Sequence, residues 1–443
     1  MTSFLRCFDE DWIEAAGADL HDFARKLFPV CRSITGAGIR QTLARIGERI
    51  PLALTDVPSG TEVFDWTVPK EWNIRDAYIK DASGSRLVDF HRNNLHVVNY
   101  STPISRTFFL DELQPHLHTL PDHPDWIPYR TTYYKPDWGF CLPHRQLLSL
   151  SEGKYEVFID STLEDGQLSY GECFLPGRTR DEVLISTHIC HPSLANDNLS
   201  GTVVSVALAQ YLARQERHYS YRFLFIPGTI GAITWLARNI DAANRIKHGM
   251  VLTCVGDAGG FHYKKSRSGD AEIDRAARHV LRHCGEPAEV LEFSPYGYDE
   301  RQYCSPGFNL PVGCLMRSVW ATFPEYHTSA DNLDFIRPES LARSLRACIS
   351  IIDVLENNRV YRNQSPFCEP QLGRRGLYGH DGVSSTGEAI NARLWVLNLS
   401  DGLHSLLDIA ERSGLPFADI YAAAAVLEEK GLLSQTDAIQ NAS

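Results

Sequence analysis

The sequence predicts an α/β protein built on a mainly parallel, mixed sheet with helices on both faces. From about residue 170, short apolar runs without polar alternation, "EVLIST", "YRFLFIP" and "GMVLTCVG", are separated by helical patterns such as "SGTVVSVALAQYLARQ". Strands of this kind are typical of a parallel sheet that is covered on both sides. A chain of 443 residues also exceeds what one core usually supports, so we expect two or three domains.

Two other parts differ from this core in texture. Residues 58–165 combine short β-prone runs with Pro, Gly and Asp turns and many aromatic residues and histidines. This pattern predicts a β-rich domain inserted into an α/β domain made of residues 1–57 and 166–362. After a polar linker, short helical patterns in residues 380–443 predict a winged-helix domain.

Charge argues against nucleic acid or an anionic membrane as a partner, because the formal net charge is −12. Residues 388–443 hold three Lys or Arg against eight Asp or Glu, so we expect the winged helix to pack or dimerise, giving a homo-oligomer, rather than to bind DNA. No apolar run approaches about 18 residues, and residues 1–20 lack a signal-peptide pattern. The eleven cysteines include no Cys-x-x-Cys pair, as expected of free thiols in a reducing cytoplasm.

Candidate metal ligands follow the predicted strands. His188 and His191 come just after "EVLIST", Asp197 stands at the entry to the next helix, Asp257 ends "GMVLTCVG", and His327 lies in a polar loop. Sites in open α/β sheets form beyond the carboxyl ends of strands, and imidazole together with carboxylate suits zinc. Taken singly, each residue also has a structural explanation, as a strand-end histidine, helix N-cap, turn residue or loop histidine.

Several segments carry a resemblance to known proteins. "NDNLSG" at 196–201 and "YHTSADN" at 326–332 resemble segments of the zinc aminopeptidase superfamily, which includes secreted leucine aminopeptidases and glutaminyl cyclases. Over nearly the full length, the chain is more similar to a family of aminopeptidase-like proteins with an inserted β domain and a C-terminal winged helix. "FPVCRSITG", "CHPSLANDNLSG", "DERQYCSPGFNLPVG" and "EYHTSADNLDF" carry that match.

The resemblance implies a zinc-dependent hydrolase that cleaves amide or peptide bonds. Asp197 would bridge two metals, His327 would bind one of them, and Asp257 is the best match for a further carboxylate ligand. The first histidine ligand is either His188 or His191, with His191 modestly favoured. One zinc ion or two is left open.

The chain departs from the superfamily after "FLFIP". There the resemblance implies two glutamates, a general base and a metal ligand, but this sequence has Gly228 and no glutamate. General acid–base catalysis contributes about 10²- to 10⁴-fold, so hydrolysis should be slow unless another acid substitutes. Asp299, Glu300 and Glu325 are the candidate catalytic acids, with exposed loop acids as the simpler interpretation. A binding or scaffold protein that has lost turnover is the alternative function.

The substrate is expected to be a small molecule or peptide-like. Arg32 and Arg40 flank the start of a helix in "CRSITGAGIR", where a carboxylate could bind, although capping and surface solvation explain them as well. Tyr298 in "YGYDERQY" is a further substrate-binding candidate. The aromatic stretch "PDWIPYRTTYYKPDWGF" is either a lid over the substrate or part of the core of the inserted domain.

Overall fold

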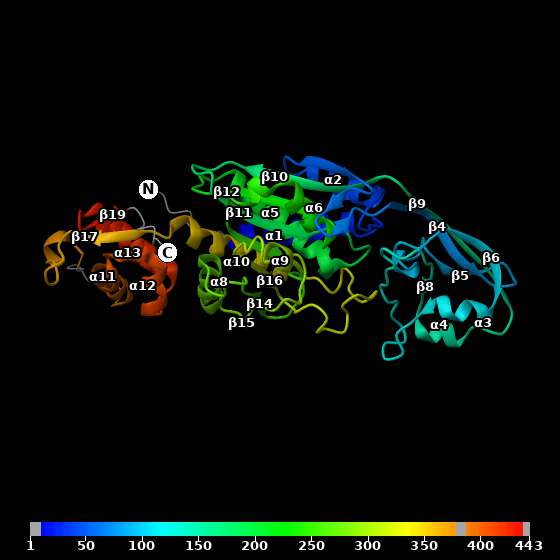
Figure 1. Ribbon diagram of the computed structural model, residues 1–443. Helices are drawn as coiled ribbons and strands as arrows, with labels where there is room; N and C mark the ends of the chain where they lie inside the picture. The colour runs from blue at the N-terminus through cyan, green and yellow to red at the C-terminus, as the bar shows by residue number, and fades with distance from the viewer. Residues whose placement is uncertain (1–9, 378–386, 437–443) are drawn as a thin grey trace. The chain divides into compact units, whose positions relative to one another are not determined.

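The computed structural model describes residues 10–377 and 387–436, and within them the predicted fold class is confirmed (Figure 1). The predicted domain boundary at residue 380 and the end of the predicted linker fall outside this described part. By their contacts the residues divide into two compact units. Unit 2 comprises 10–269 and 289–346, and unit 1 comprises 270–288 together with the described residues from 347 onward.

Unit 2 is built on an eight-stranded mixed sheet. Its strands lie in the order β1 (Ala53–Pro58), β10 (Gln167–Leu175), β12 (Ser220–Ile226), β11 (Glu182–His188), β13 (Ile246–Leu252), β16 (Val312–Met316), β14 (Phe261–Lys264) and β15 (Ala288–Leu291). The four central strands, β12, β11, β13 and β16, are parallel, whereas β1, β10 and β14 pair antiparallel with their neighbours. Every residue of β11 and β12 is buried, which explains why apolar and polar residues do not alternate along these strands.

Helices pack around this sheet. They are α1 (Glu10–Leu27), α2 (Ala37–Gly47), α5 (Gly201–Ala213), α6 (Ile230–Arg238), α7 (Ile240–Ala243), α9 (Glu300–Tyr303) and the first part of α10 (Pro338–Asn357), whose residues from 347 onward belong to unit 1. Of these, α5 packs against β11 and β10, and α1 packs against α5. None of the helices in the described residues combines the length and apolar character that a membrane crossing requires.

The inserted segment forms its own small sheet and core within unit 2. Its four-stranded sheet has the order β5 (Arg86–Asp89), β4 (Glu71–Lys80), β9 (Lys154–Glu164) and β6 (Ile104–Phe109). Two short pairs, β2 (Glu62–Val63) with β3 (Trp66–Thr67) and β7 (Leu117–His118) with β8 (Phe140–Cys141), accompany it. Short helices complete it: α3 (Leu110–Leu113), α4 (His144–Leu148), η1 (Asn94–His96) and η2 (Gln114–His116). Its core includes Val88, Phe108, Phe140 and Val157.

Unit 1 contains the winged helix. Its helices are α8 (Glu272–His283), α11 (Gly387–Leu399), α12 (Leu406–Ser413) and α13 (Phe417–Glu429), with the short η4 (Gly373–Arg375). Its sheet has the order β18 (Asp401–Ser405), β17 (Val360–Asn363) and β19 (Leu433–Thr436). The central strand β17 lies at the predicted end of the α/β domain at residue 362 and the start of the polar linker, and it was not predicted, because a four-residue strand bordered by polar residues gives little periodic signal.

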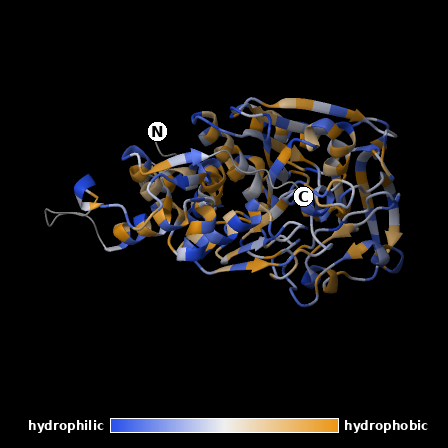
Figure 2. Cartoon of the chain, turned by 60° about the vertical axis from the view of Figure 1, so that its left-hand side comes forward, coloured by the Kyte–Doolittle hydropathy of each residue, from blue (hydrophilic) through white to orange (hydrophobic). Residues whose placement is uncertain are grey.

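Hydropathy follows the same plan in both units, with orange and blue residues interleaved along most helices in Figure 2. In unit 1, Arg275 of α8 forms ion pairs with Asp408 and Glu411 of α12.

In unit 2, a buried group of charged side chains lies at the start of β11. The Glu182 side chain is 1% exposed and accepts hydrogen bonds from Arg222 Nε (2.6 Å) and Arg245 Nε (2.7 Å).

Replacing Glu182 by alanine should lower the free energy of unfolding by about 2 kcal/mol, because the buried Arg222 would lose one of its two carboxylate partners and keep only Glu172. The matched control is Glu216→Ala, which removes an exposed pair with Arg178 and should cost less than about 1 kcal/mol. Urea unfolding followed by tryptophan fluorescence measures both changes. Equal losses in the two variants would contradict this account of the buried pair.

Candidate metal centre

The candidate site lies at the carboxyl end of the parallel strands. His188 is the last residue of β11, and His191 follows it in the loop. Asp197 lies in the irregular turn Ala195–Ser200 (η3) that leads into α5. His327 comes from the loop between β16 and α10. His188, His191 and Asp197 are 1%, 7% and 2% exposed, so the centre is shielded from solvent.

Three imidazoles converge on the carboxylate of Asp197. His188 Nε2 lies 2.8 Å from Oδ1, and His191 Nδ1 lies 3.1 Å from Oδ2. His327 Nε2 lies 2.9 Å from the same Oδ2. Both His188 and His191, the two alternatives for the first ligand, therefore reach the centre.

The protonation states of this group are set by burial and by the carboxylate. Burial lowers the pKa of His188 to about 4 and also lowers that of His327, although Asp197 partly offsets both shifts. For His191, burial acts downward, but the charge and hydrogen bonds of Asp197 outweigh it and raise the pKa. Burial acts upward on Asp197, and the histidines outweigh it and hold its pKa well below the usual range. The carboxylate is therefore ionised, and His188 and His327 are neutral.

This donor set fits a zinc ion. His188, His191 and Asp197 each offer a ligand atom, and these atoms all lie within 4.8 Å of one another. Within residues 10–377 and 387–436 they are the one group of three His, Cys, Asp or Glu residues with this geometry. Zinc binds neutral imidazole nitrogen and carboxylate oxygen together, and a site with three protein ligands keeps a position open.

The turn that carries Asp197 is held by Asp331. Its Oδ1 accepts hydrogen bonds from the backbone N–H groups of Ala195 (3.1 Å) and Asn196 (2.5 Å), and its Oδ2 accepts one from that of Asp197 (2.9 Å). Burial raises the pKa of Asp331 to about 7, although these N–H donors act in the opposite direction. Asp331 thus orients the Asp197 backbone.

Asp257 is saturated by other partners. Its Oδ2 accepts a hydrogen bond from Asn196 Nδ2 (2.7 Å), and its Oδ1 accepts hydrogen bonds from Ser318 Oγ and Gly259 N–H (2.7 Å each). It does not belong to the group formed by His188, His191 and Asp197. The structure therefore places Asp257 behind the centre, where it holds the side chain of Asn196.

Two tyrosines border the histidines. Tyr129 comes from the inserted segment, and its ring packs edge-on against His191 (5.2 Å between centroids) and His327 (5.1 Å). The ring centroid of Tyr298 lies 4.0 Å from that of His188, and its hydroxyl is 3.5 Å from His191 Nε2. The aromatic stretch expected either as a lid or as core thus contributes one ring directly to the wall of the site.

The three candidate catalytic acids, Asp299, Glu300 and Glu325, lie outside the group formed by His188, His191 and Asp197. Asp299 and Glu300 are fully buried, unlike the exposed loop acids of the simpler interpretation, whereas Glu325 is half-buried. Glu300 is paired with Lys264 (2.8 Å). Neither carboxylate oxygen of Asp299 has a hydrogen-bond partner among the described residues, and burial raises its pKa far above the usual range. Burial therefore disfavours the ionised form of Asp299.

The two candidate arginines differ as well. Arg40 pairs with Glu71 (2.6 Å), so it is already neutralised. Arg32 is buried and donates from Nε to the backbone carbonyl of His191 (2.8 Å) and from Nη1 to that of Leu27 (2.6 Å). Arg32 therefore supports the loop that carries His191, and burial lowers the pKa of its guanidinium to about 10.

Sequence reasoning did not single out Asp331, Asn196, Asn198 or Tyr129. Asn198 Nδ2 donates to Thr187 Oγ1 (2.9 Å) and to the carbonyl of Leu252 (3.0 Å), which joins the turn to the ends of β11 and β13. The available signal was the clustering of amide and carboxylate side chains in "NDN" and "SADN" around Asp197 and His327.

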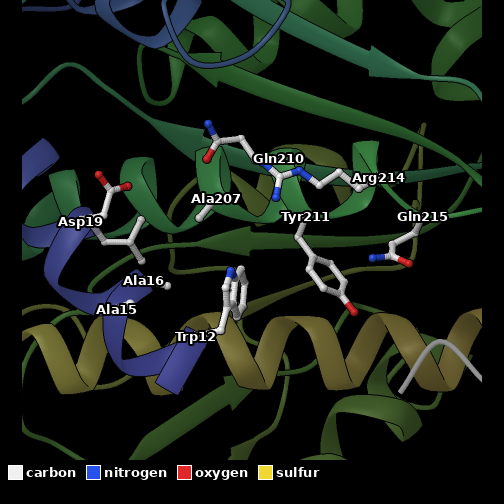
Figure 3. Close-up of a pocket in the computed structure, with 10 residues that line it drawn as sticks. Trp12, Ala15, Ala16, Asp19, Ala207, Gln210, Tyr211, Arg214 and Gln215 are labelled. Atoms are coloured by element: carbon white, nitrogen blue, oxygen red, sulfur yellow. The ribbon is translucent and has the colours of Figure 1, made fainter. Parts of the chain in front are cut away.

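A cleft elsewhere in unit 2 contains none of these residues (Figure 3). It has a volume of about 430 Å³ and lies between α1 and α5, where Trp12 and Tyr211 face it along with Gln210 and Arg214. The ring centroids of Trp12 and Tyr211 lie 5.9 Å apart. No metal-ligand group lines this cleft, so it is separate from the metal centre.

Asp331→Ala should weaken zinc binding by about 10- to 100-fold, because the turn bearing Asp197 loses three backbone partners. Competition with a chromophoric chelator measures the affinity. Asp334→Ala, an exposed acid in the same loop, is the matched control and should leave the affinity unchanged. Unchanged zinc affinity in a folded Asp331→Ala protein would show that the turn keeps its shape without this carboxylate.

Comparison with known proteins agrees with this architecture. A Clostridium acetobutylicum protein whose name includes the words "polysaccharide biosynthesis protein with aminopeptidase-like domain" is 52% identical over 418 residues, covering 94% of this chain and 96% of the relative. A crystal structure from the same organism matches with a TM-score of 0.92 at 50% identity and covers 96% of this chain and 99% of that one.

More distant structures share the fold alone. A zinc aminopeptidase from Bacillus subtilis has a TM-score of 0.56 at 12% identity, over 77% of this chain and 94% of that one. A peptidase M28 precursor from Shewanella amazonensis has a TM-score of 0.53 at 14% identity, over 80% and 98%. Residues 359–435 match a winged helix-turn-helix family. Residues 21–358 match the family described as "Domain of unknown function (DUF4910)", and because this match spans more than half of the sequence, the chain belongs to that family.

Proposed function

We propose that this protein is a metal-dependent hydrolase of amide or peptide bonds, with zinc held by His188, His191 and Asp197. The observation that carries the proposal is the convergence of these three buried side chains at the carboxyl end of a sheet with the zinc aminopeptidase fold. His327 contacts the same carboxylate and is the fourth candidate ligand. This donor set favours one ion, because the saturated Asp257 is not free to bind a second.

Zinc, when bound, would polarise a carbonyl and lower the pKa of a water molecule. The protein's own residues supply the surroundings. Asp331 fixes the orientation of Asp197, and Tyr129 covers one side of His191 and His327. The Tyr298 hydroxyl faces His191 and is placed to donate a hydrogen bond to a substrate oxygen.

The substrate that we propose is a small molecule or peptide-like compound with a hydrolysable amide. We include N-acylated sugars among the proposed substrates because the name of the Clostridium acetobutylicum relative contains the words "polysaccharide biosynthesis". The proposed setting is the cytoplasm, with neither nucleic acid nor membrane as a partner, because the acidic charge disfavours both. A homo-oligomer through the acidic winged helix remains part of this proposal.

A second candidate is a binding protein that uses the same metal centre without turnover. Gly228 favours it, because no side chain at this position can act as a base. Of the other candidate acids, Glu300 is paired with Lys264, and burial raises the pKa of Asp299 and so disfavours its basic form. Both candidates require the metal, and turnover distinguishes them.

The test is the zinc content of purified protein measured by mass spectrometry. Wild type should carry about one zinc per chain, and Asp197→Asn should lose at least about 10-fold in zinc affinity, because the carboxylate on which three imidazoles converge is replaced by an amide. Asp241→Asn, an exposed acid in α7, is the control and should keep the metal.

Hydrolysis is then assayed on aminoacyl anilides and N-acetylated amino sugars. Turnover that is lost in Asp197→Asn supports the hydrolase. Stoichiometric zinc without turnover on the whole panel supports the binding protein. Wild type without zinc, or Asp197→Asn with unchanged zinc, refutes both candidates.

A further inference from the structure

Tyr298 fills the space beside Gly228. A Cβ atom built on Gly228 would lie 2.2 Å from Cε1 and 2.4 Å from the hydroxyl oxygen of Tyr298. Distances below about 3 Å do not occur between such atoms in a packed interior, so any side chain at position 228 would have to displace the ring. Glycine is therefore required here by the position of one tyrosine.

The other side of the same ring faces the metal centre. Its centroid lies 4.0 Å from that of His188, and its hydroxyl lies 3.7 Å from Cys190 Sγ and 3.5 Å from His191 Nε2. Tyr298 thus stands between Gly228 and the two histidines. The same ring therefore contacts both the position of a side chain at 228 and the two histidines.

A buried ion pair holds the loop that carries Tyr298. Glu300 accepts hydrogen bonds from the Tyr298 backbone N–H at both oxygens (3.2 and 3.1 Å), and Lys264 Nζ donates to Glu300 and to the carbonyl of Tyr296 (2.8 Å each). The side chains of Lys264 and Glu300 are 3% and 0% exposed. A Cβ at Gly297 would lie 1.9 Å from Glu300 Oε1, so the loop closes directly over the pair.

We propose that the Tyr298 ring occupies the place of a catalytic side chain at position 228, so that the site holds either this phenol or a side chain at 228, but not both. The steric exclusion does not depend on the proposed function. Its consequence, that the rate of amide hydrolysis is limited by the missing base, rests on the proposed function. The Lys264–Glu300 pair acts through Tyr298, because it fixes the backbone from which the ring extends. Replacing Gly228 alone should therefore not create a working base.

The exclusion is tested by thermal unfolding of the full chain in a double-mutant cycle. Gly228→Ala should lower the melting temperature by about 2 °C or more in the wild-type background, because the added methyl group would overlap the ring. In the Tyr298→Ala background, the same change should cost less than half as much. The matched control is Gly307→Ala, whose Cβ would have nothing within 4 Å and which should leave the melting temperature unchanged.

Equal losses in the two backgrounds would overturn the proposal, because they would show that position 228 and the ring do not compete. Tyr298→Phe serves as a second background. It keeps the ring, so Gly228→Ala should remain costly there. A loss of that cost in Tyr298→Phe would also overturn the steric account.

Activity supplies an independent readout. With zinc added, Gly228→Glu and Tyr298→Ala should each remain at the wild-type rate or below it, and the double variant Gly228→Glu with Tyr298→Ala should exceed Gly228→Glu by about 10²-fold, the lower contribution of a general base. Full activation by Gly228→Glu alone would overturn the exclusion. If no variant hydrolyses any amide but the melting temperatures are coupled, the hydrolase proposal fails and the exclusion between positions 228 and 298 stands.

Discussion

The carboxylate of Asp331 joins two loops that are far apart in the sequence, and the candidate site depends on this junction. Asp331 receives three backbone N–H groups from the turn at 195–197, and that turn in return presents Asp197 to His327. The two loops therefore hold each other. Because Asp331, Asp197 and the turn at 195–197 are almost completely buried, water cannot readily replace the hydrogen bonds that a displaced loop would lose.

The sequence predicted the part of the architecture that depends on periodicity. Continuous apolar runs identified β11, β12 and β13 as central strands, and strand ends located His188 at the edge where sites form. Periodicity and strand ends could not predict which groups the Asp257 side chain contacts. Whether a carboxylate after a strand reaches a metal or a neighbouring amide depends on side-chain directions, and here Asn196 and Ser318 reach it first.

The burial of the acids in "YGYDERQY" could not be predicted from the sequence either. Its acids suggest a solvated loop, yet Asp299 and Glu300 are 0% exposed. The charge that permits Glu300 to be buried comes from Lys264 on β14, which no spacing rule connects to it. Likewise, Gly228 could be recognised in the sequence as a missing glutamate, but only the structure shows that Tyr298 has taken the space.

The inserted segment is coupled to the metal centre by backbone as well as by side chains. The N–H of Tyr129 donates to the carbonyl of His327 (2.8 Å), and Ser329 and Ile127 exchange two further hydrogen bonds. Residues 127–129 therefore run antiparallel beside the loop that carries His327. A shift of the inserted segment would move a candidate ligand together with the ring that covers it. The contacts that place the Tyr129 ring against His191 and His327 therefore also hold the loop that carries His327.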